Sequence, residues 1–153
     1  MNLIFVVIMM LILAVVIVAG YRAVKDLNTA VQNIQGAPAE AKEITQNVRD
    51  RYVGIGDGLF ITLFVFSFII LIASAVVIDT HPIFFIIAFF MTVIAGFLGG
   101  HIANTYAELE SSGLRAEAVE FTIIPFIFKH FVKIIVIEGM VVAIVLYAKL
   151  RNS

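Results

Sequence analysis

The stretch LFITLFVFSFIILIASAVVI, residues 59–78, decides the fold, because it runs for twenty positions without a charged side chain. A helix needs about 20 apolar residues to cross the hydrocarbon core of a bilayer. Within that core the backbone has no water to pair with, so the segment must be helical despite its many Val, Ile and Phe residues. A membrane β-barrel would instead show alternating segments of about 10 residues, and the sequence contains none.

Three more apolar stretches join this one and predict an integral membrane protein. Residues 1–20 and 82–103 are each long enough to span a bilayer, and a fourth span is expected within residues 121–150. Of the 153 residues, 62% are hydrophobic and only 14% are charged, whereas roughly a quarter of the residues of a soluble domain are charged. We therefore expect an all-α protein of about four transmembrane helices, with too little chain outside the bilayer for a soluble enzyme domain.

The first apolar stretch is expected to be a retained membrane anchor. A secretory signal peptide has a basic segment followed by an apolar core of about 7–15 residues. Here the apolar run is longer, no Lys or Arg precedes it, and Arg22 and Lys25 follow it. A retained helix is therefore the preferred interpretation, and a cleaved signal is the alternative.

Residues 21–58 are the longest polar segment, and they are expected to form a helical hairpin outside the membrane. Apolar side chains recur at helical spacing on both sides of a break at Gly36-Ala37-Pro38. These side chains are Val24, Leu27, Val31 and Ile34 before the break and Ala41, Ile44, Val48 and Tyr52 after it. The second helix is expected to end at Gly54, Gly56 and Gly58. Neither helix is long enough to be stable alone in water, so each must pack on the other or on a partner.

Two further connections complete the expected topology. A tight turn is expected at Asp79-Thr80-His81-Pro82, because Pro82 suits the first position of a helix. Residues 104–120 are expected to form an acidic loop with a break at Ser111-Ser112-Gly113. Lys and Arg favour the cytoplasmic side of a membrane. The two longer loops contain Arg22, Lys25, Lys42, Arg49, Arg51 and Arg115, and the opposite side has Lys149 and Arg151. This asymmetry predicts cytoplasmic loops and both termini outside.

The fourth span contains the candidate functional residues, the ionisable side chains Lys129, His130, Lys133 and Glu138. Ionisable groups within a bilayer are costly and often functional, so one interpretation is a proton or ion relay between His130 and Glu138. Helical geometry weakens this interpretation, because Glu138 lies about 180° around the helix from Lys129 and about 140° from Lys133, with His130 the nearest at about 80°. We therefore prefer an interfacial or tilted helix over residues 121–132, with Lys129 and Lys133 reaching the headgroups. Glu138 then lies near mid-membrane with no assigned role.

Small side chains in the third span predict a helix-packing face. Ala88, Thr92, Gly96 and Gly100 recur every four residues, and Ala95 and Gly99 form a parallel pair. Small residues at this spacing let two helix backbones approach closely in a membrane. Packing within the chain or between copies is the expected role, and chance recurrence of Ala and Gly is the alternative.

Patterns typical of catalysis, cofactor binding and nucleic-acid binding are missing from the sequence. Without cysteine there is no thiol catalysis or Fe–S cluster, and a net charge of −1 gives no basic field for nucleic acid. The glycines at 54, 56 and 58 follow no strand, so they do not predict a phosphate-binding loop. Asp79 and His81 could ligate a metal but lack a third ligand nearby. We expect no enzyme activity, no cofactor, no metal and no small-molecule substrate.

The second half of the chain resembles membrane proteins of icosahedral phages that have an internal membrane, of the tectivirus and corticovirus kind. The shared features cover roughly residues 79–150. They are His81-Pro82 opening an apolar span, Asn104-Thr105-Tyr106 closing it, an acidic amphipathic loop, Phe121-Thr122-Ile123-Ile124-Pro125, and a final apolar helix with Gly139 that ends in Leu146-Tyr147-Ala148-Lys149. The resemblance implies a structural protein lying in the virion membrane beneath the capsid, and it brings no catalytic residues.

These observations lead to one expected function and two alternatives. The leading hypothesis is a structural protein in a virion internal membrane or host cytoplasmic membrane, whose partners are the lipid bilayer and copies of itself or other virion proteins. The first alternative is a small pore or ion-conducting protein of the holin or channel type. The second is an accessory subunit of a larger membrane complex.

Overall fold

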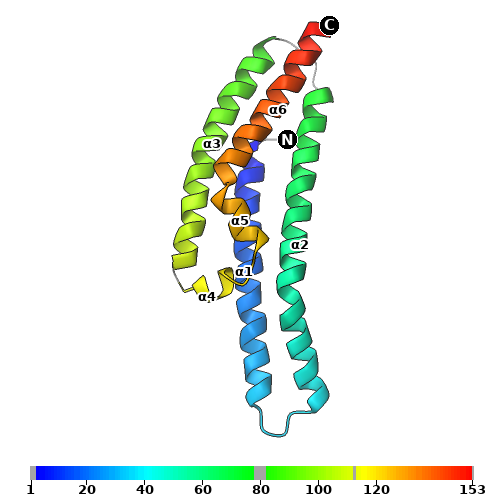
Figure 1. Ribbon diagram of the computed structural model, residues 1–153, viewed down its shortest axis with the longest axis vertical. Coiled ribbons are helices and arrows are strands. Elements are labelled where there is room, and N and C mark those ends of the chain that lie inside the picture. Colours follow the sequence, from blue (N-terminus) through cyan, green and yellow to red (C-terminus); the bar gives the residue numbers. More distant parts are fainter. Residues whose placement is uncertain (1–2, 78–81, 112, 153) are drawn as a thin grey trace.

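The computed structural model describes residues 3–77, 82–111 and 113–152, and the regular structure within them is entirely helical. The helices are α1 (Leu3–Asn33), α2 (Ala39–Val77), α3 (Pro82–Ser111), α4 (Arg115–Ala118), α5 (Ile123–Lys129) and α6 (Phe131–Asn152) (Figure 1). Four of them, α1, α2, α3 and α6, are long and apolar enough to cross a bilayer. The prediction of an all-α integral membrane protein with four spans is confirmed. The turn residues Asp79, Thr80 and His81 and the loop residue Ser112 lie outside the described residues.

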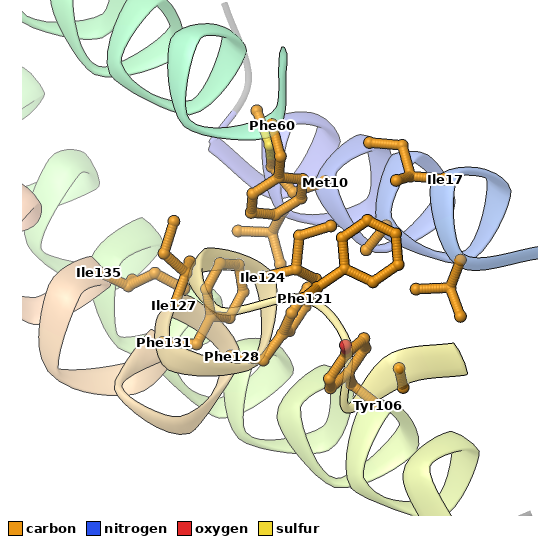
Figure 2. Packing of buried hydrophobic residues seen from close by; sticks show 14 of the residues in the cluster. Met10, Ile17, Phe60, Tyr106, Phe121, Ile124, Ile127, Phe128, Phe131 and Ile135 are labelled. Atoms are coloured by element: carbon orange, nitrogen blue, oxygen red, sulfur yellow. The ribbon is translucent and has the colours of Figure 1, made fainter. Parts of the chain in front are cut away.

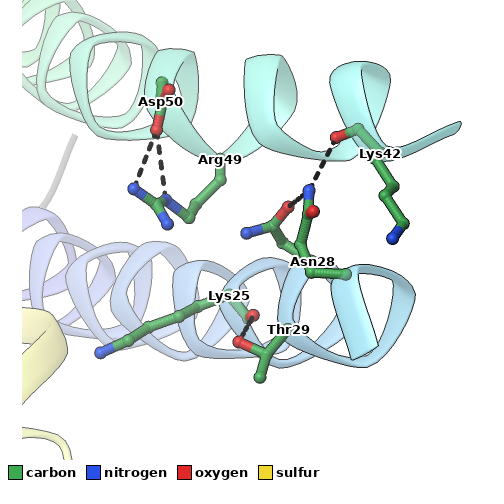
Figure 3. Close-up of polar contacts among 7 residues, drawn as sticks. Lys25, Asn28, Thr29, Lys42, Arg49 and Asp50 are labelled. Carbon is green, nitrogen blue, oxygen red and sulfur yellow. Dashed lines mark hydrogen bonds and ion pairs between the residues drawn. The ribbon is translucent and has the colours of Figure 1, made fainter. Parts of the chain in front are cut away.

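One long antiparallel hairpin of α1 and α2 contains both a pair of spans and the polar segment between them (Figure 1). At its turn Gly36 has a φ of +85°, a left-handed conformation that glycine adopts without strain. Close to the turn the Gln32 amide donates to the Lys42 carbonyl oxygen at 3.0 Å and makes a longer contact, 3.5 Å, with the Asn28 side chain (Figure 3). The polar helices are therefore continuations of the two spans.

The expected helix end at Gly54, Gly56 and Gly58 is wrong, because α2 continues through all three glycines. A glycine inside a helix costs about 1 kcal/mol relative to alanine, which weakens a helix without ending it. The long apolar run that follows must remain helical in lipid. Gly56 also permits a close contact, since a Cβ there would lie 2.7 Å from an Ile17 methyl and 2.9 Å from the Phe121 ring.

The second half of the chain pairs α3 with α6 and connects them through the short helices α4 and α5 (Figure 1). α3 continues to Ser111, so the first half of the expected acidic loop is helical and the helix ends beside the expected break. α4 lies against α1 and α3, and α5 lies against α2 and α3. At His130, whose N–H bonds to the carbonyl oxygens of Phe126 and Ile127, α5 gives way to α6. Residues 121–150 are thus divided into a short helix and a span.

The hydrophobic core is concentrated where α5 enters the bundle (Figure 2). Its largest fully buried side chains are Phe60 of α2, Ile124 and Phe128 of α5, and Phe131 of α6. The first half of α3 is different, because it exposes a nearly continuous apolar surface made of Ile83, Phe84, Phe85, Ile86, Ile87, Phe89 and Phe90. In water so large an apolar patch would be a liability. In a bilayer the lipid chains cover it.

Single cysteines test which segments share a side of the membrane. Gln46 in α2 and Ala116 in α4 are both exposed, and the chain has no cysteine of its own. We expect an impermeant maleimide to label Gln46→Cys and Ala116→Cys from the same side, because two spans separate them. Arg151→Cys, at the end of α6, should be labelled only from the other side. Labelling of the first two variants from opposite sides would contradict the four-span topology.

Candidate functional site

Among the described residues, Asp57 is a buried carboxylate with several backbone partners; it lies in the middle of α2 and is only 7% exposed. Its Oδ2 accepts the backbone N–H groups of Thr122 at 2.8 Å and Ile123 at 3.1 Å, and its Oδ1 accepts that of Ile124 at 3.1 Å. The first N–H groups of a helix have no partner within the helix, and they attract negative charge. Asp57 therefore caps α5 from another helix.

A local cap is missing at this end of α5. Thr122 occupies the N-cap position, where a hydroxyl commonly accepts a backbone N–H, but its side chain makes no such bond. The acceptor comes instead from a residue 65 positions earlier in the chain. Because a buried carboxylate is costly unless it is paired, the cap also satisfies Asp57 itself. The contact joins α2 to the connection between α3 and α6.

Aromatic side chains surround this cap and hold the same connection on α1. The rings of Tyr21 and Phe121 meet edge to face with their centroids 5.6 Å apart, and the Tyr52 ring lies 5.9 Å from that of Tyr21. Edge-to-face geometry is favourable for aromatic pairs. Tyr21 and Phe121 are both buried, so Phe121, two residues before α5, is enclosed between α1 and α2.

Polar contacts hold α4 to the same region of α1. The Lys25 ammonium lies 3.4 Å from Oε1 of the buried Glu117, and the Arg22 guanidinium donates to the Gly113 carbonyl oxygen at 3.2 Å. Glu117 Oε2 is buried and has no hydrogen-bond partner among the described residues. Arg22 and Lys25, two of the basic residues on which the predicted membrane orientation is based, thus also attach the α3–α6 connection to the α1–α2 hairpin.

Sequence reasoning missed Asp57 as a key residue, although a signal was present. The residue stands alone between Gly56 and Gly58, immediately before a span of twenty residues without charge. A carboxylate at such a boundary needs a partner or water. The identity of the partner could not be read from the sequence, because backbone N–H groups carry no residue signature.

Only part of the predicted small-residue face of α3 makes the close contact with α6. A Cβ at Gly99 would lie 2.6 Å from an Ile135 methyl, whereas one at Gly96 would meet nothing within 4 Å. Thr92 lies against Gly139 of α6, and Thr92 Oγ1 donates to the Ala88 carbonyl oxygen at 2.9 Å. At Gly100 a Cβ would be in ordinary contact with Val132 at 3.8 Å. The contact therefore includes Thr92 and Gly99, with the buried Ala95 between them on α3, and Gly96 lies beside it.

The ionisable residues of the last span do not form one site. Lys129 and Lys133 are exposed, and His130 Nδ1 lies 2.9 Å from the Phe126 carbonyl oxygen. Glu138 is buried on the inner face of α6. Among the described residues, none of these four side chains forms a hydrogen bond or ion pair with another of the four. The relay between His130 and Glu138 has no direct contact to support it.

Within the described part of the chain, no group of three His, Asp or Glu side chains is arranged to hold a metal ion. In comparisons with protein-family models, curated protein sequences and solved structures, nothing matches this chain. Several polar side chains join segments that are far apart in the sequence: Asp57 bonds to the start of α5, Lys25 pairs with Glu117 of α4, and Arg22 bonds to Gly113 just before α4. Another such contact is made by Lys149 Nζ, which donates to the Val76 carbonyl oxygen near the end of α2 at 2.8 Å.

Replacing Gly99 with Leu tests the α3–α6 contact. The added side chain would collide with Ile135, and overpacking of this kind costs about 1–3 kcal/mol. We expect Gly99→Leu to lower the melting temperature of the purified protein in detergent. Gly96→Leu is the matched control, since it makes the same change three residues away and meets open space. An equal fall in melting temperature in both variants, or no fall in either, would contradict the observed contact.

Proposed function

We propose that this chain is a structural integral membrane protein of a virion, which organises an internal membrane beneath an icosahedral capsid. The feature that supports this proposal is the polar end of the first hairpin, residues 21–57, which we call the stalk. It extends beyond α3 and α4 (Figure 1). The stalk would place a protein-binding surface outside the lipid, as a protein linking a membrane to a surrounding shell requires.

The outer face of the stalk has an apolar surface that no described residue of this chain covers. Ile44, Val48 and Ile55 are all exposed on α2, with Ile55 67% exposed. Together with Arg51 and Tyr52 they line a shallow groove of about 400 Å³. Exposed apolar patches outside the bilayer commonly mark sites of protein contact. A capsid protein, another virion membrane protein or a second copy of the chain is the proposed partner.

The packing of the spans is consistent with a scaffold. Asp57, Lys25, Arg22 and Lys149 hold helices to one another, and the apolar face of α3 is available to lipid. Such a protein needs a rigid bundle, a lipid-facing surface and a contact surface outside the membrane. The phage-like features of residues 79–150 point to the same role.

A second candidate function, a small pore of the holin or channel type, is favoured by Glu138. Its side chain is 5% exposed, and its Oε1 has no hydrogen-bond partner among the described residues. A carboxylate inside a bilayer often belongs to a proton or ion path. An accessory subunit of a larger membrane complex is a third candidate, in which another protein would supply the partner of Glu138.

The stalk face can be tested by its effect on incorporation into particles. We expect the double change Ile44→Asp and Val48→Asp to reduce the amount of the chain in purified particles about tenfold, as the loss of a central apolar contact would. Quantitative mass spectrometry of particles and of host membranes measures this ratio. Gln46→Asp, at an exposed polar position of the same helix, is the control. Wild-type chain found in host membranes but absent from particles would contradict the virion role.

Conductance measurements separate the scaffold from the pore. Reconstituted into planar bilayers, the scaffold should pass no current, and Glu138→Gln should assemble like the wild-type protein because it keeps the shape of the side chain. Glu120→Gln, outside the spans, is the matched control. A wild-type current that Glu138→Gln abolishes and Glu120→Gln preserves would favour the pore over the scaffold.

A further inference from the structure

Between α3 and α5 the surface contains a hollow of about 380 Å³. It is lined by Ala103, Asn104, Tyr106 and Ala107 of α3 and by Pro125, Phe126, Phe128 and Lys129 of α5. Most of this lining is apolar or aromatic, and the polar side-chain donors in it include the Asn104 amide and the Lys129 ammonium, together with the Tyr106 hydroxyl. Such a combination suits a ligand with an apolar body and one charged or polar group.

The sequence of the two helices explains why the hollow remains open. Ala103 and Ala107 lie one turn apart on α3, so the helix presents small side chains where larger ones would fill the space. Tyr106 and Phe128 stack almost parallel, with centroids 4.3 Å apart and an interplanar angle of 9°. Because both rings are buried, this stack forms a fixed inner wall.

The position of the hollow matches the depth of the lipid headgroups. Lys129 lies two residues before the last span, Phe131–Lys149, and Asn104 lies in the final part of the third span, Ile83–Leu109. Phe126, which lines the hollow, is 61% exposed, as suits an aromatic ring in contact with the bilayer interface. The hollow is therefore adjacent to lipid, on the side of the membrane where the basic loops lie.

We propose that this hollow is a binding site for an anionic phospholipid. The phosphate would lie between the Lys129 ammonium and the Asn104 amide, and the glycerol and upper acyl chain would lie over Phe126 and Ala107. Lys129 forms no ion pair with a described residue, and Glu108, one turn beyond Asn104, is not among the residues that line the hollow. The positive charge of Lys129 is thus available for a lipid phosphate. This inference requires only a bilayer, so it is independent of the virion role.

Native mass spectrometry of the full chain tests the site. The protein is released from mixed micelles that contain equal amounts of phosphatidylglycerol and phosphatidylcholine, and the fraction carrying each lipid is measured. We expect wild type to retain phosphatidylglycerol preferentially and Lys129→Gln to lower that fraction about fivefold, as the loss of one charge near a membrane surface would. Lys133→Gln is the control, because this exposed lysine does not line the hollow. Equal losses in the two variants, or no preference in wild type, would overturn the proposal.

A second variant tests the shape of the site without changing its charge. Ala107→Phe should fill the hollow and displace phosphatidylglycerol, whereas Val93→Phe, on an exposed part of the same helix, should not. Position 107 is exposed, so the variant is expected to fold, which circular dichroism checks. Inorganic phosphate in excess should leave the bound lipid in place. Displacement by inorganic phosphate, or undiminished lipid binding by Ala107→Phe, would overturn the assignment of a phospholipid to this hollow.

Discussion

Three backbone amides and one buried carboxylate meet where α5 begins, and the arrangement of the later helices depends on that contact. Asp57 needs a partner because it is buried at the edge of a span, and the first amides of α5 need an acceptor because a helix leaves them unpaired. Each group removes the cost of the other. The result attaches the connection between α3 and α6 to the first hairpin, with Phe121 enclosed between Tyr21 and Gly56.

The cap also explains why the core is uneven. α5 brings Ile124, Ile127 and Phe128 into the bundle on the side of the loops, where they join one buried cluster with residues of α1, α2, α3 and α6. Farther along the spans, α3 presents its apolar side chains outward, where lipid covers them. One side of the membrane therefore has a dense protein core with a stalk beyond it. The short helix that builds this core also forms one wall of the hollow beside Lys129.

Much of the fold could be predicted from the sequence, because long apolar runs in lipid leave the backbone little choice. The spans and the break at Gly36-Ala37-Pro38 are confirmed. The glycines at 54, 56 and 58 led to a wrong prediction of a helix end. Such a cluster usually marks a turn in a soluble protein, but here the apolar span that follows keeps the chain helical. Gly99 faces Ile135 of α6 whereas Gly96, three residues earlier, faces open space, and the spacing of the small residues alone does not say which of the two faces the other helix. The Asp57 cap needed a partner 65 residues away, which no local pattern reveals.

Hydrogen exchange at Thr122, Ile123 and Ile124 measures the central contact most directly. These three amides donate to Asp57, so their protection depends on the carboxylate more than on α5 itself. In Asp57→Ala we expect them to exchange at least about tenfold faster than in wild type, in line with the loss of a helix cap. Asp50→Ala, which removes an exposed carboxylate from the same helix, should leave them unchanged. Equal protection of the three amides in wild type and Asp57→Ala would contradict the account.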